Sequence, residues 1–254
     1  MAKKAKKNAL LGGVHPAVIS VWAALIAAAH LLPAIVLVGT GGTMSVSAIL
    51  VPLAGVLFGP VAGTLVGAIG QFIGFLIAPA GAWLGMFTFL IGTCTALTTG
   101  LASRGKGPYA LILSGLGIVL WMTQEIGRKA WIFGAVFGGY GFVCLLITCF
   151  IGKKFLMSKN LVKKGISIFL CCVGGMCTSG MLANFSSLVL FKTPAITWKV
   201  LVAVSPVERT IFAVAAVIIG IPLLVGLPKV GIFVGPQPED VDEEEDEDME
   251  EEVK

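Results

Sequence analysis

The sequence has few of the side chains on which most catalytic chemistry depends. Charged residues make up 13% of the 254 residues and histidine occurs twice, while Glu125 and Glu208 are the only acidic residues outside 239–252. An enzyme acting on lipid or isoprenoid phosphates would need clustered carboxylates for magnesium, or a nucleophile beside its base. The chain also has no GxxxxGK[ST] loop to cradle the phosphates of ATP. We therefore expect a protein that is not an enzyme and that holds no cofactor.

The cysteines do not form a metal-binding or disulfide pattern. No CxxC spacing occurs, and all six cysteines lie within apolar stretches. Such cysteines are typical of small buried hydrophobic side chains. The six residues are Cys94, Cys144, Cys149, Cys171, Cys172 and Cys177.

What the chain has in abundance is apolar sequence. Hydrophobic residues make up 57% of it and the mean hydropathy is +0.97. The longest apolar runs reach the roughly 20 residues that a helix needs to cross a bilayer. They are continuous rather than alternating, which favours helices over a membrane barrel. The sequence predicts an all-α, multi-pass membrane protein, and we interpret the first apolar block as a retained span rather than a signal peptide.

We expect about eight membrane segments, separated by glycine, proline and charged residues. Their approximate bounds are Pro16 to Val38, Thr43 to Phe58, Pro60 to Ala78, Ala82 to Ser103, Pro108 to Met122, Ala130 to Gly152, Gly165 to Phe191 and Pro206 to Leu227. Together they form a transmembrane domain over 14–230, preceded by a basic cytoplasmic segment, 1–13. The second and fifth segments are short enough to be re-entrant.

The distribution of basic residues supports eight crossings. If the amino terminus is cytoplasmic and every segment crosses, 13 of the 18 basic residues face the cytoplasm and 5 face outside. This is the direction that the positive-inside rule demands. Both termini are then cytoplasmic, and we expect the protein in the plasma membrane.

The carboxyl-terminal segment 231–254 differs sharply from the rest in composition. Residues 239–252 contain 12 of the 14 acidic residues. Such a run has little apolar surface to bury, so we expect a disordered cytoplasmic tail. Its role is either to solubilise the protein or to dock onto a basic partner.

Small residues recur at helical spacing in the third segment. Gly63, Gly67, Gly70 and Gly74 lie at i, i+4, i+7 and i+11 and therefore share one face of a helix. Small residues at this spacing let helices approach closely in a membrane. We interpret the glycine face as internal helix packing, while the alanine pairs of the first segment (Ala23 with Ala27 and Ala24 with Ala28) suit either internal packing or a partner helix.

Polar side chains gather in the half of the bundle that this topology places outside. A polar group at membrane depth is costly and is therefore a candidate for function. The asymmetry predicts a cavity open to the exterior, where aromatic rings stack on a flat ligand and the glycine-rich loop 38–43 closes over it. The residues predicted to bind the ligand are Gln71, Trp83, Trp121, Gln124, Glu125, Arg128 and Asn184; His30, Glu208 and Arg209 lie in the same half.

We expect a hinge at Gly59-Pro60, between the second and third segments. This hinge and the glycine face together resemble a known family. Leu50-Val51-Pro52-Leu53-Ala54-Gly55-Val56-Leu57-Phe58-Gly59-Pro60, followed by Ala62-Gly63, Gly67 and Ile73-Gly74, is similar to the substrate-binding (S) components of energy-coupling factor (ECF) transporters. The earlier run from Ala23 to Ala29 is similar to that family's AxxxA helix. The resemblance covers roughly residues 18 to 125.

Membership of this family would imply a six-helix core, so that residues 130 to 227 include either an added hairpin or a differently divided set of helices. It would also imply capture of a vitamin-like small molecule outside the cell, with import driven by a transmembrane coupling subunit and ABC-type ATPases. Ala23, Ala24, Ala27 and Ala28 would contact the coupling subunit, and no nucleic acid would be a partner. The alternative is a non-catalytic membrane anchor of a larger complex, which predicts packed helices without a cavity.

Overall fold

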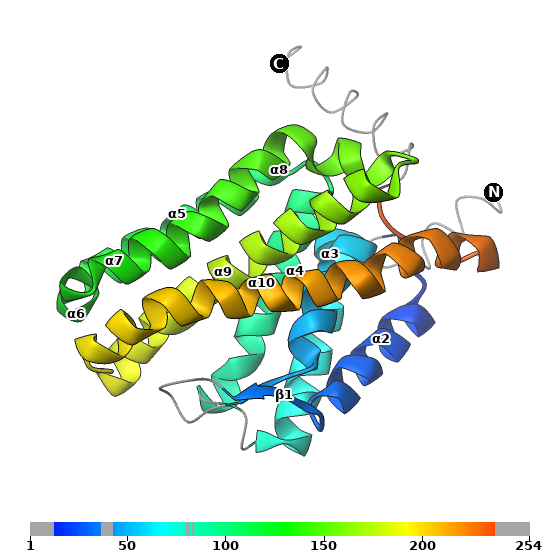
Figure 1. Cartoon of the computed structure of the whole chain (residues 1–254). Coiled ribbons are helices and arrows are strands. Elements are labelled where there is room, and N and C mark those ends of the chain that lie inside the picture. The colour runs from blue at the N-terminus through cyan, green and yellow to red at the C-terminus, as the bar shows by residue number, and fades with distance from the viewer. Residues whose placement is uncertain (1–12, 37–42, 80–81, 83, 237–254) are drawn as a thin grey trace, which may run out of the picture.

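The computed structural model describes residues 13–36, 43–79, 82 and 84–236, and these form a bundle of helices. Figure 1 shows α2, α3 and α4 side by side, while α5, α8, α9 and α10 run across them as long neighbouring helices. The bounds are α2 Pro16–Ala29, α3 Ser47–Ile77, α4 Thr88–Ser103, α5 Gly107–Thr123, α6 Glu125–Lys129, α7 Trp131–Phe133, α8 Gly139–Met157, α9 Leu161–Phe191 and α10 Ala195–Gly226.

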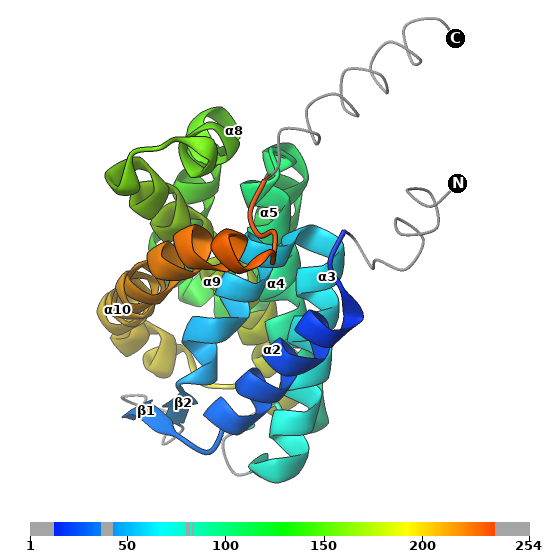
Figure 2. The same ribbon diagram turned by 90° about the vertical axis from the view of Figure 1, so that its right-hand side faces the viewer.

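Short elements complete the bundle. A 3₁₀ turn at Gly85–Phe87 (η2) precedes α4, a π-helical stretch at Gly134–Gly138 (η3) joins α7 to α8, and a second 3₁₀ turn at Leu227–Val230 (η4) follows α10. The strands β1, Pro33–Val36, and β2, Thr43–Ser45, pair antiparallel and lie beside the end of α2 (Figure 2). The all-α class is therefore confirmed, with one small hairpin that the sequence did not predict.

Five helical stretches of the described residues are long and apolar enough to cross a membrane, and α2 and α5 are shorter apolar helices. The five are Ser47–Ile77, Gly85–Ser103, Trp131–Met157, Leu161–Phe191 and Ala195–Val230. The protein is thus a multi-pass helical membrane protein, as the hydropathy predicted.

Helix α3 is interrupted at Gly59, where the sequence predicted a hinge. This residue has φ 80° and ψ −174°, and Pro60 follows it without a backbone N–H. A Cβ on Gly63 would lie 2.7 Å from both the Ala54 oxygen and the Gly55 Cα. Residues nine apart in a straight helix are about 13 Å apart, so the chain folds back at Gly59 into a helical hairpin. The predicted hinge is confirmed.

The glycine face packs inside the molecule, as predicted. A Cβ on Gly67 would lie 3.0 Å from Cβ of Ala96 in α4, and one on Gly70 would lie 2.9 Å from the Ala23 oxygen in α2. A side chain on Gly74 would collide with the ring of His30. The returning arm of the α3 hairpin is therefore held between α2 and α4 at nearly backbone contact.

Several of the predicted segment bounds are wrong. The fourth segment begins its α-helix at Thr88 rather than Ala82, the sixth continues to Met157 rather than Gly152, and the seventh begins at Leu161 rather than Gly165. The first segment does not continue to Val38, because α2 ends at Ala29 and Pro33–Val36 is a strand. The second begins at Ser47 rather than Thr43, which belongs to β2. The last begins at Ala195, eleven residues before Pro206, because a proline inside a long helix was interpreted as a start.

The two ends of the bundle differ in charge. At the end where α4 and α8 finish and α5 and α9 begin lie Arg104, Lys106, Lys153, Lys154, Lys159, Lys163 and Lys164, and Lys229 follows α10 there. The opposite end carries α6, the start of α10 and the strand pair (Figure 1). We call the first the basic end.

Candidate functional site

A polar cluster joins the end of α2 to both arms of the α3 hairpin, at the end of the bundle opposite the basic end. Nε2 of His30 lies 3.1 Å from Oε1 of Gln71 and 3.4 Å from Oγ of Ser47, which in turn bonds the Ser45 hydroxyl. Gln71 and Ser47 are buried. The fold-back at Gly59 is what brings Ser47 and Gln71, 24 positions apart, to the same imidazole.

The hydrogen bonds define the imidazole's chemistry. Nδ1 of His30 lies 2.9 Å from the Ile26 carbonyl oxygen, which can only accept, so Nδ1 carries the proton. In a neutral ring Nε2 is then an acceptor, satisfied by the Ser47 hydroxyl or by the amide NH₂ of Gln71 when that amide is turned over. The side-chain amide of Gln71 has both a donor NH₂ and an acceptor oxygen, so the cluster can bind either kind of polar atom.

Gln71 is positioned by the absence of a side chain opposite it. A Cβ on Gly92 of α4 would collide with Cγ of Gln71, so Gln71 fits only because α4 has a glycine there. The side chain therefore lies between α2 and α4, where helix packing restricts its rotamers.

A second cluster is aromatic and lies where α5, α7, η3 and α10 meet. The Trp121 ring is fully buried, 5.2 Å from the Phe133 centroid and 4.9 Å from that of Trp198. The indole N–H of Trp198 donates to the Thr193 oxygen, whereas Nε1 of Trp121 is buried without a hydrogen-bond partner among the described residues. A buried, unpaired donor costs free energy, so Trp121 Nε1 is a position where a ligand acceptor would be stabilised.

Gln124, Glu125 and Arg128 lie together on the short turn of α6, at the surface. Glu125 accepts from Nζ of Lys129 at 2.7 Å. Arg128 instead reaches the Thr123 carbonyl oxygen at 3.5 Å. The Lys129 hydrogen bond and charge lower the pKa of Glu125.

The remaining predicted residues are separated from these. Asn184 is half-buried on α9, and Trp83 and the loop 38–42 lie outside the described residues. Within the part of the chain that the structure describes, no hydrogen bond joins Gln71 to Gln124, Glu125 or Arg128. The structure thus resolves the predicted site into a polar cluster, an aromatic cluster and a surface turn.

Glu208 and Arg209 lie in the middle of α10. The predicted segment bound at Pro206 had placed them at the start of the helix. Glu208 is 6% exposed and belongs to the buried stripe of that helix. The Arg209 guanidinium lies 5.8 Å from the centroid of the Phe137 ring in η3. The error follows directly from missing the first third of α10, before Pro206.

The four alanines of α2 divide between two faces. Ala23 and Ala27 are buried, with the Ala23 oxygen close to Gly70 of α3. Ala24 and Ala28 are exposed on the opposite side of the helix. Only the second pair presents a small-residue face to a partner helix.

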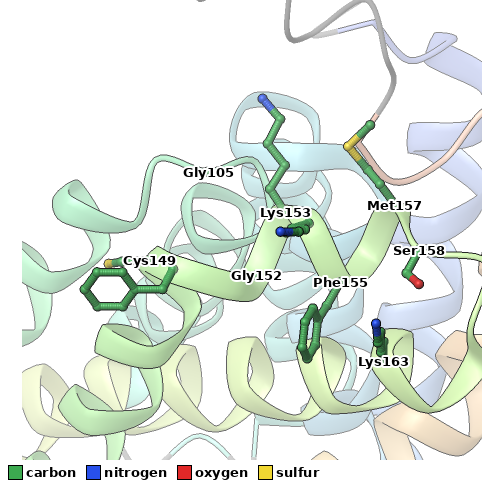
Figure 3. A pocket seen from close by; sticks show the side chains of 10 residues that line it. Gly105, Cys149, Gly152, Lys153, Phe155, Met157, Ser158 and Lys163 are labelled. Atoms are coloured by element: carbon green, nitrogen blue, oxygen red, sulfur yellow. The ribbon is translucent and has the colours of Figure 1, made fainter.

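A groove of about 650 Å³ lies at the basic end, between α8 and the start of α9. Figure 3 shows Lys153, Met157 and Ser158 around it, with Lys163 facing the Phe155 ring. This hollow was not predicted from the sequence. The expected cavity at the other end would be walled partly by residues outside the described ones, and it stays a prediction.

Three residues of these clusters were absent from the predicted ligand-binding set. His30 was identified as a polar residue in the outer half of the bundle. Ser47 was not, because its contact with His30 and Gln71 depends on the fold-back of α3. Trp198 fell outside the predicted segments altogether, because α10 was started too late. The available signal was helical spacing, because Trp198, Leu201 and Ser205 lie at i, i+3 and i+7 and share one buried face.

Comparison with known proteins gives a family over the amino-terminal part. Residues 15–130, from the cap of α2 to the end of α6, match the family model described as "ECF-type riboflavin transporter, S component". The chain is also 24% identical over 162 residues to an uncharacterized protein of Methanocaldococcus jannaschii, an alignment that covers 63% of this chain and 54% of that protein. The chain thus spans about half the length of the curated relative it matches. No solved structure matches.

The matched region contains the features that led to the resemblance. These are the α3 hairpin, the glycine face and the alanines of α2. The polar cluster around His30 also lies within the matched region. Residues 15–130 of this multi-pass membrane protein are thus similar to the S components of ECF-type transporters.

Proposed function

We propose that the protein is the substrate-binding membrane subunit of an ECF transporter and that it captures a vitamin-like small molecule. The observation that carries this proposal is the family match over 15–130, because that region builds a buried polar cluster beneath the strand pair. A polar cluster at the end of an apolar bundle suits a ligand with few, well-placed polar atoms. The family description makes riboflavin the first ligand to test.

The orientation follows from charge. The basic end faces the cytoplasm under the positive-inside rule, so both termini are cytoplasmic and the polar cluster lies toward the exterior. Ligand then enters at the end that carries the strand pair, and the loop 38–43 between the strands is the segment proposed to close over it.

The ligand contacts that we propose are the amide of Gln71, supported by His30, and the indole N–H of Trp121. Gln71 is preorganised by Gly92 and His30, and Trp121 Nε1 has no protein partner among the described residues. Trp83, Gln124, Glu125, Arg128 and Asn184 complete the proposed set as residues of the rim or of α9. A ligand that lacks a matching atom would leave a buried polar group unpaired, which would give selectivity.

Import requires partners that supply energy. The proposed partners are a transmembrane coupling subunit, which would pack on the Ala24 and Ala28 face of α2, and ABC-type ATPases. Small residues at this spacing allow close helix contact in lipid. The bilayer itself is the third partner, through the apolar outer faces of the spans.

The test is ligand binding to the purified full chain, with riboflavin as the first probe and mass spectrometry of co-purified small molecules alongside. Gln71→Ala and Trp121→Phe should each weaken binding by roughly tenfold, the equivalent of one lost buried hydrogen bond. Thr93→Ala is the matched control, because among the described residues the Thr93 hydroxyl bonds only the Phe89 oxygen of its own helix, at 2.9 Å.

Unchanged affinity in Gln71→Ala and Trp121→Phe, and also in Gln124→Ala, Glu125→Ala and Asn184→Ala, would refute the site. Absence of any co-purified or added small-molecule ligand, with recovery of a large assembly that lacks ATPases, would instead favour a membrane anchor.

A further inference from the structure

The groove at the basic end has the composition of a site for an acidic peptide. Lys153, Lys154 and Lys163 line it together with the apolar side chains of Phe150, Phe155 and Met157. Lys154 and Lys163 are exposed. Clustered lysines beside apolar side chains attract carboxylates, and they do so most strongly at low ionic strength.

The described part of the chain supplies no carboxylate to this end. Glu125 and Glu208 are the acidic residues among those described, and they lie on α6 and in the middle of α10. The remaining 12 acidic residues of the sequence fall within 239–252. The chain therefore has one concentrated source of negative charge and one basic end of opposite sign.

The last described residues bring the chain to the groove. The backbone N–H of Gly235 donates to the Leu57 oxygen at 2.7 Å, and Nη2 of Arg104 donates to the same oxygen at 3.2 Å. Gly105, which follows Arg104 in the sequence, lines the groove, and a Cβ on Gly105 would lie 3.1 Å from Cδ of Lys153. The chain thus leaves the described structure beside this groove.

The length of the segment permits docking. The first acidic residue, Glu239, is three positions beyond Pro236, which corresponds to a reach of about 10 Å in extended chain. The whole acidic run could span several times that distance. Neither the exit point nor the length forces the segment away from the lysines.

We propose that the acidic segment 239–252 docks in this groove, with its carboxylates paired to Lys153, Lys154 and Lys163. The contact is intramolecular and covers the cytoplasmic face of α8 and α9. It does not depend on the transport function, since it rests on the groove, the charge distribution and the position of Gly235.

The test is zero-length carbodiimide crosslinking of the full chain in nanodiscs of phosphatidylcholine, at low salt, with mass spectrometry of the linked peptides. We expect links from 239–252 to the three groove lysines and few to Lys192 and Lys199, exposed lysines at the opposite end. The links should be lost at about 1 M salt, where the Debye length is roughly 3 Å. Mixed isotope-labelled and unlabelled protein distinguishes links within one chain from links between copies.

A second measurement avoids dependence on crosslinking chemistry. Cleavage of the acidic segment by a glutamate-specific protease should be roughly fivefold faster in the triple variant Lys153→Gln, Lys154→Gln, Lys163→Gln, because weak ion pairs that protect the segment are removed. Lys192→Gln with Lys199→Gln should leave the rate unchanged.

The proposal is overturned if groove lysines are linked no more than Lys192 and Lys199, or if all links join different copies. It is overturned equally if links form in phosphatidylcholine but disappear at the same salt in discs with phosphatidylglycerol, because anionic headgroups would then hold the groove. Equal cleavage rates in both lysine variants would also contradict it.

Discussion

Helices α2–α4 and helices α5–α10 achieve close packing in different ways. In the first group several glycines meet backbone: a Cβ on Gly100 would lie 2.6 Å from the Pro60 Cα, and one on Gly63 would lie 2.7 Å from the Ala54 oxygen. In the second group most closely packed glycines receive side chains, such as Leu145 against Gly174. Rings fill the remaining space, with Phe133 stacked on Phe137 at 5.2 Å.

The difference has a consequence for mutation. A side chain can change its rotamer when a neighbour grows, whereas a backbone atom can move only with its helix. We therefore expect α2–α4 to tolerate added atoms poorly, and α5–α10 to tolerate removed atoms poorly.

The largest effect should come from removing the central ring of the second group. Trp121→Ala leaves a cavity between Phe133 and Trp198, and we expect it to lower the free energy of unfolding by about 3–5 kcal/mol. Trp131→Ala is the control in the same segment, because Trp131 is 56% exposed and should contribute little. Thermal unfolding in detergent, followed by near-ultraviolet circular dichroism, measures both; equal losses would show that the aromatic cluster is not a core.

The next effect tests the first group. Gly55→Ala places a methyl group against Oγ1 of Thr99 and the Ala96 oxygen, and we expect a loss of roughly 2–3 kcal/mol from forced separation of α3 and α4.

Gly139→Ala is the matched control for Gly55→Ala, since no heavy atom lies within 4 Å of its added Cβ. In that helical position alanine should stabilise the protein by about 0.5–1 kcal/mol. Similar effects of the two substitutions on the unfolding temperature would remove the distinction between the two groups.

The same contrast explains what could be predicted from the sequence. The hinge at Gly59 and the internal glycine face were predictable, because backbone contact depends on residues that are small at a fixed local spacing. The bounds of α5, to within one residue, and the end of α9 at Phe191 followed from uninterrupted apolar runs. Pro206, by contrast, was interpreted as a helix start although it lies inside α10, which hid Trp198 and misplaced Glu208.

The candidate site was less predictable, because it depends on contacts between distant residues. Gln71 was identified as polar at membrane depth, but its pairing with His30 and Ser47 requires the fold-back of α3. Trp121 was expected at a rim, and its burial arises from α7 and α10 closing over it. The sequence alone indicates that a buried polar group needs a hydrogen-bond partner, but it does not identify that partner.

The exposed and the packed faces of α2 can be separated by substitution. Ala24→Trp and Ala28→Trp change the exposed face, so they should weaken co-purification with the proposed coupling subunit by roughly tenfold without lowering stability. Ala23→Trp changes the face packed on Gly70 and should destabilise the chain itself. If Ala23→Trp alone abolished co-purification, at unchanged stability, the partner would bind the Ala23 face of α2 and the proposed Ala24 and Ala28 face would be wrong.

The smallest effect concerns the surface turn α6, which belongs to neither mode of packing. Lys129 lowers the pKa of Glu125, so the pair contributes stability above the carboxyl group's ordinary pKa of 4.5 and loses it as pH falls through the lowered value. The Glu125 side chain is 73% exposed, so we expect Glu125→Gln to shift the unfolding temperature by less than about 1 °C at neutral pH and not at all in acid.

Lys129→Gln should reproduce the result of Glu125→Gln, because each substitution removes the same pair. A shift of several degrees in unfolding scans at neutral pH would mean that α6 is held down by this pair. Gly127, which packs against the Trp121 carbonyl oxygen, already attaches the turn to the aromatic cluster through backbone contact. Since that attachment does not titrate, the turn should stay in place over Trp121 when the ion pair is lost.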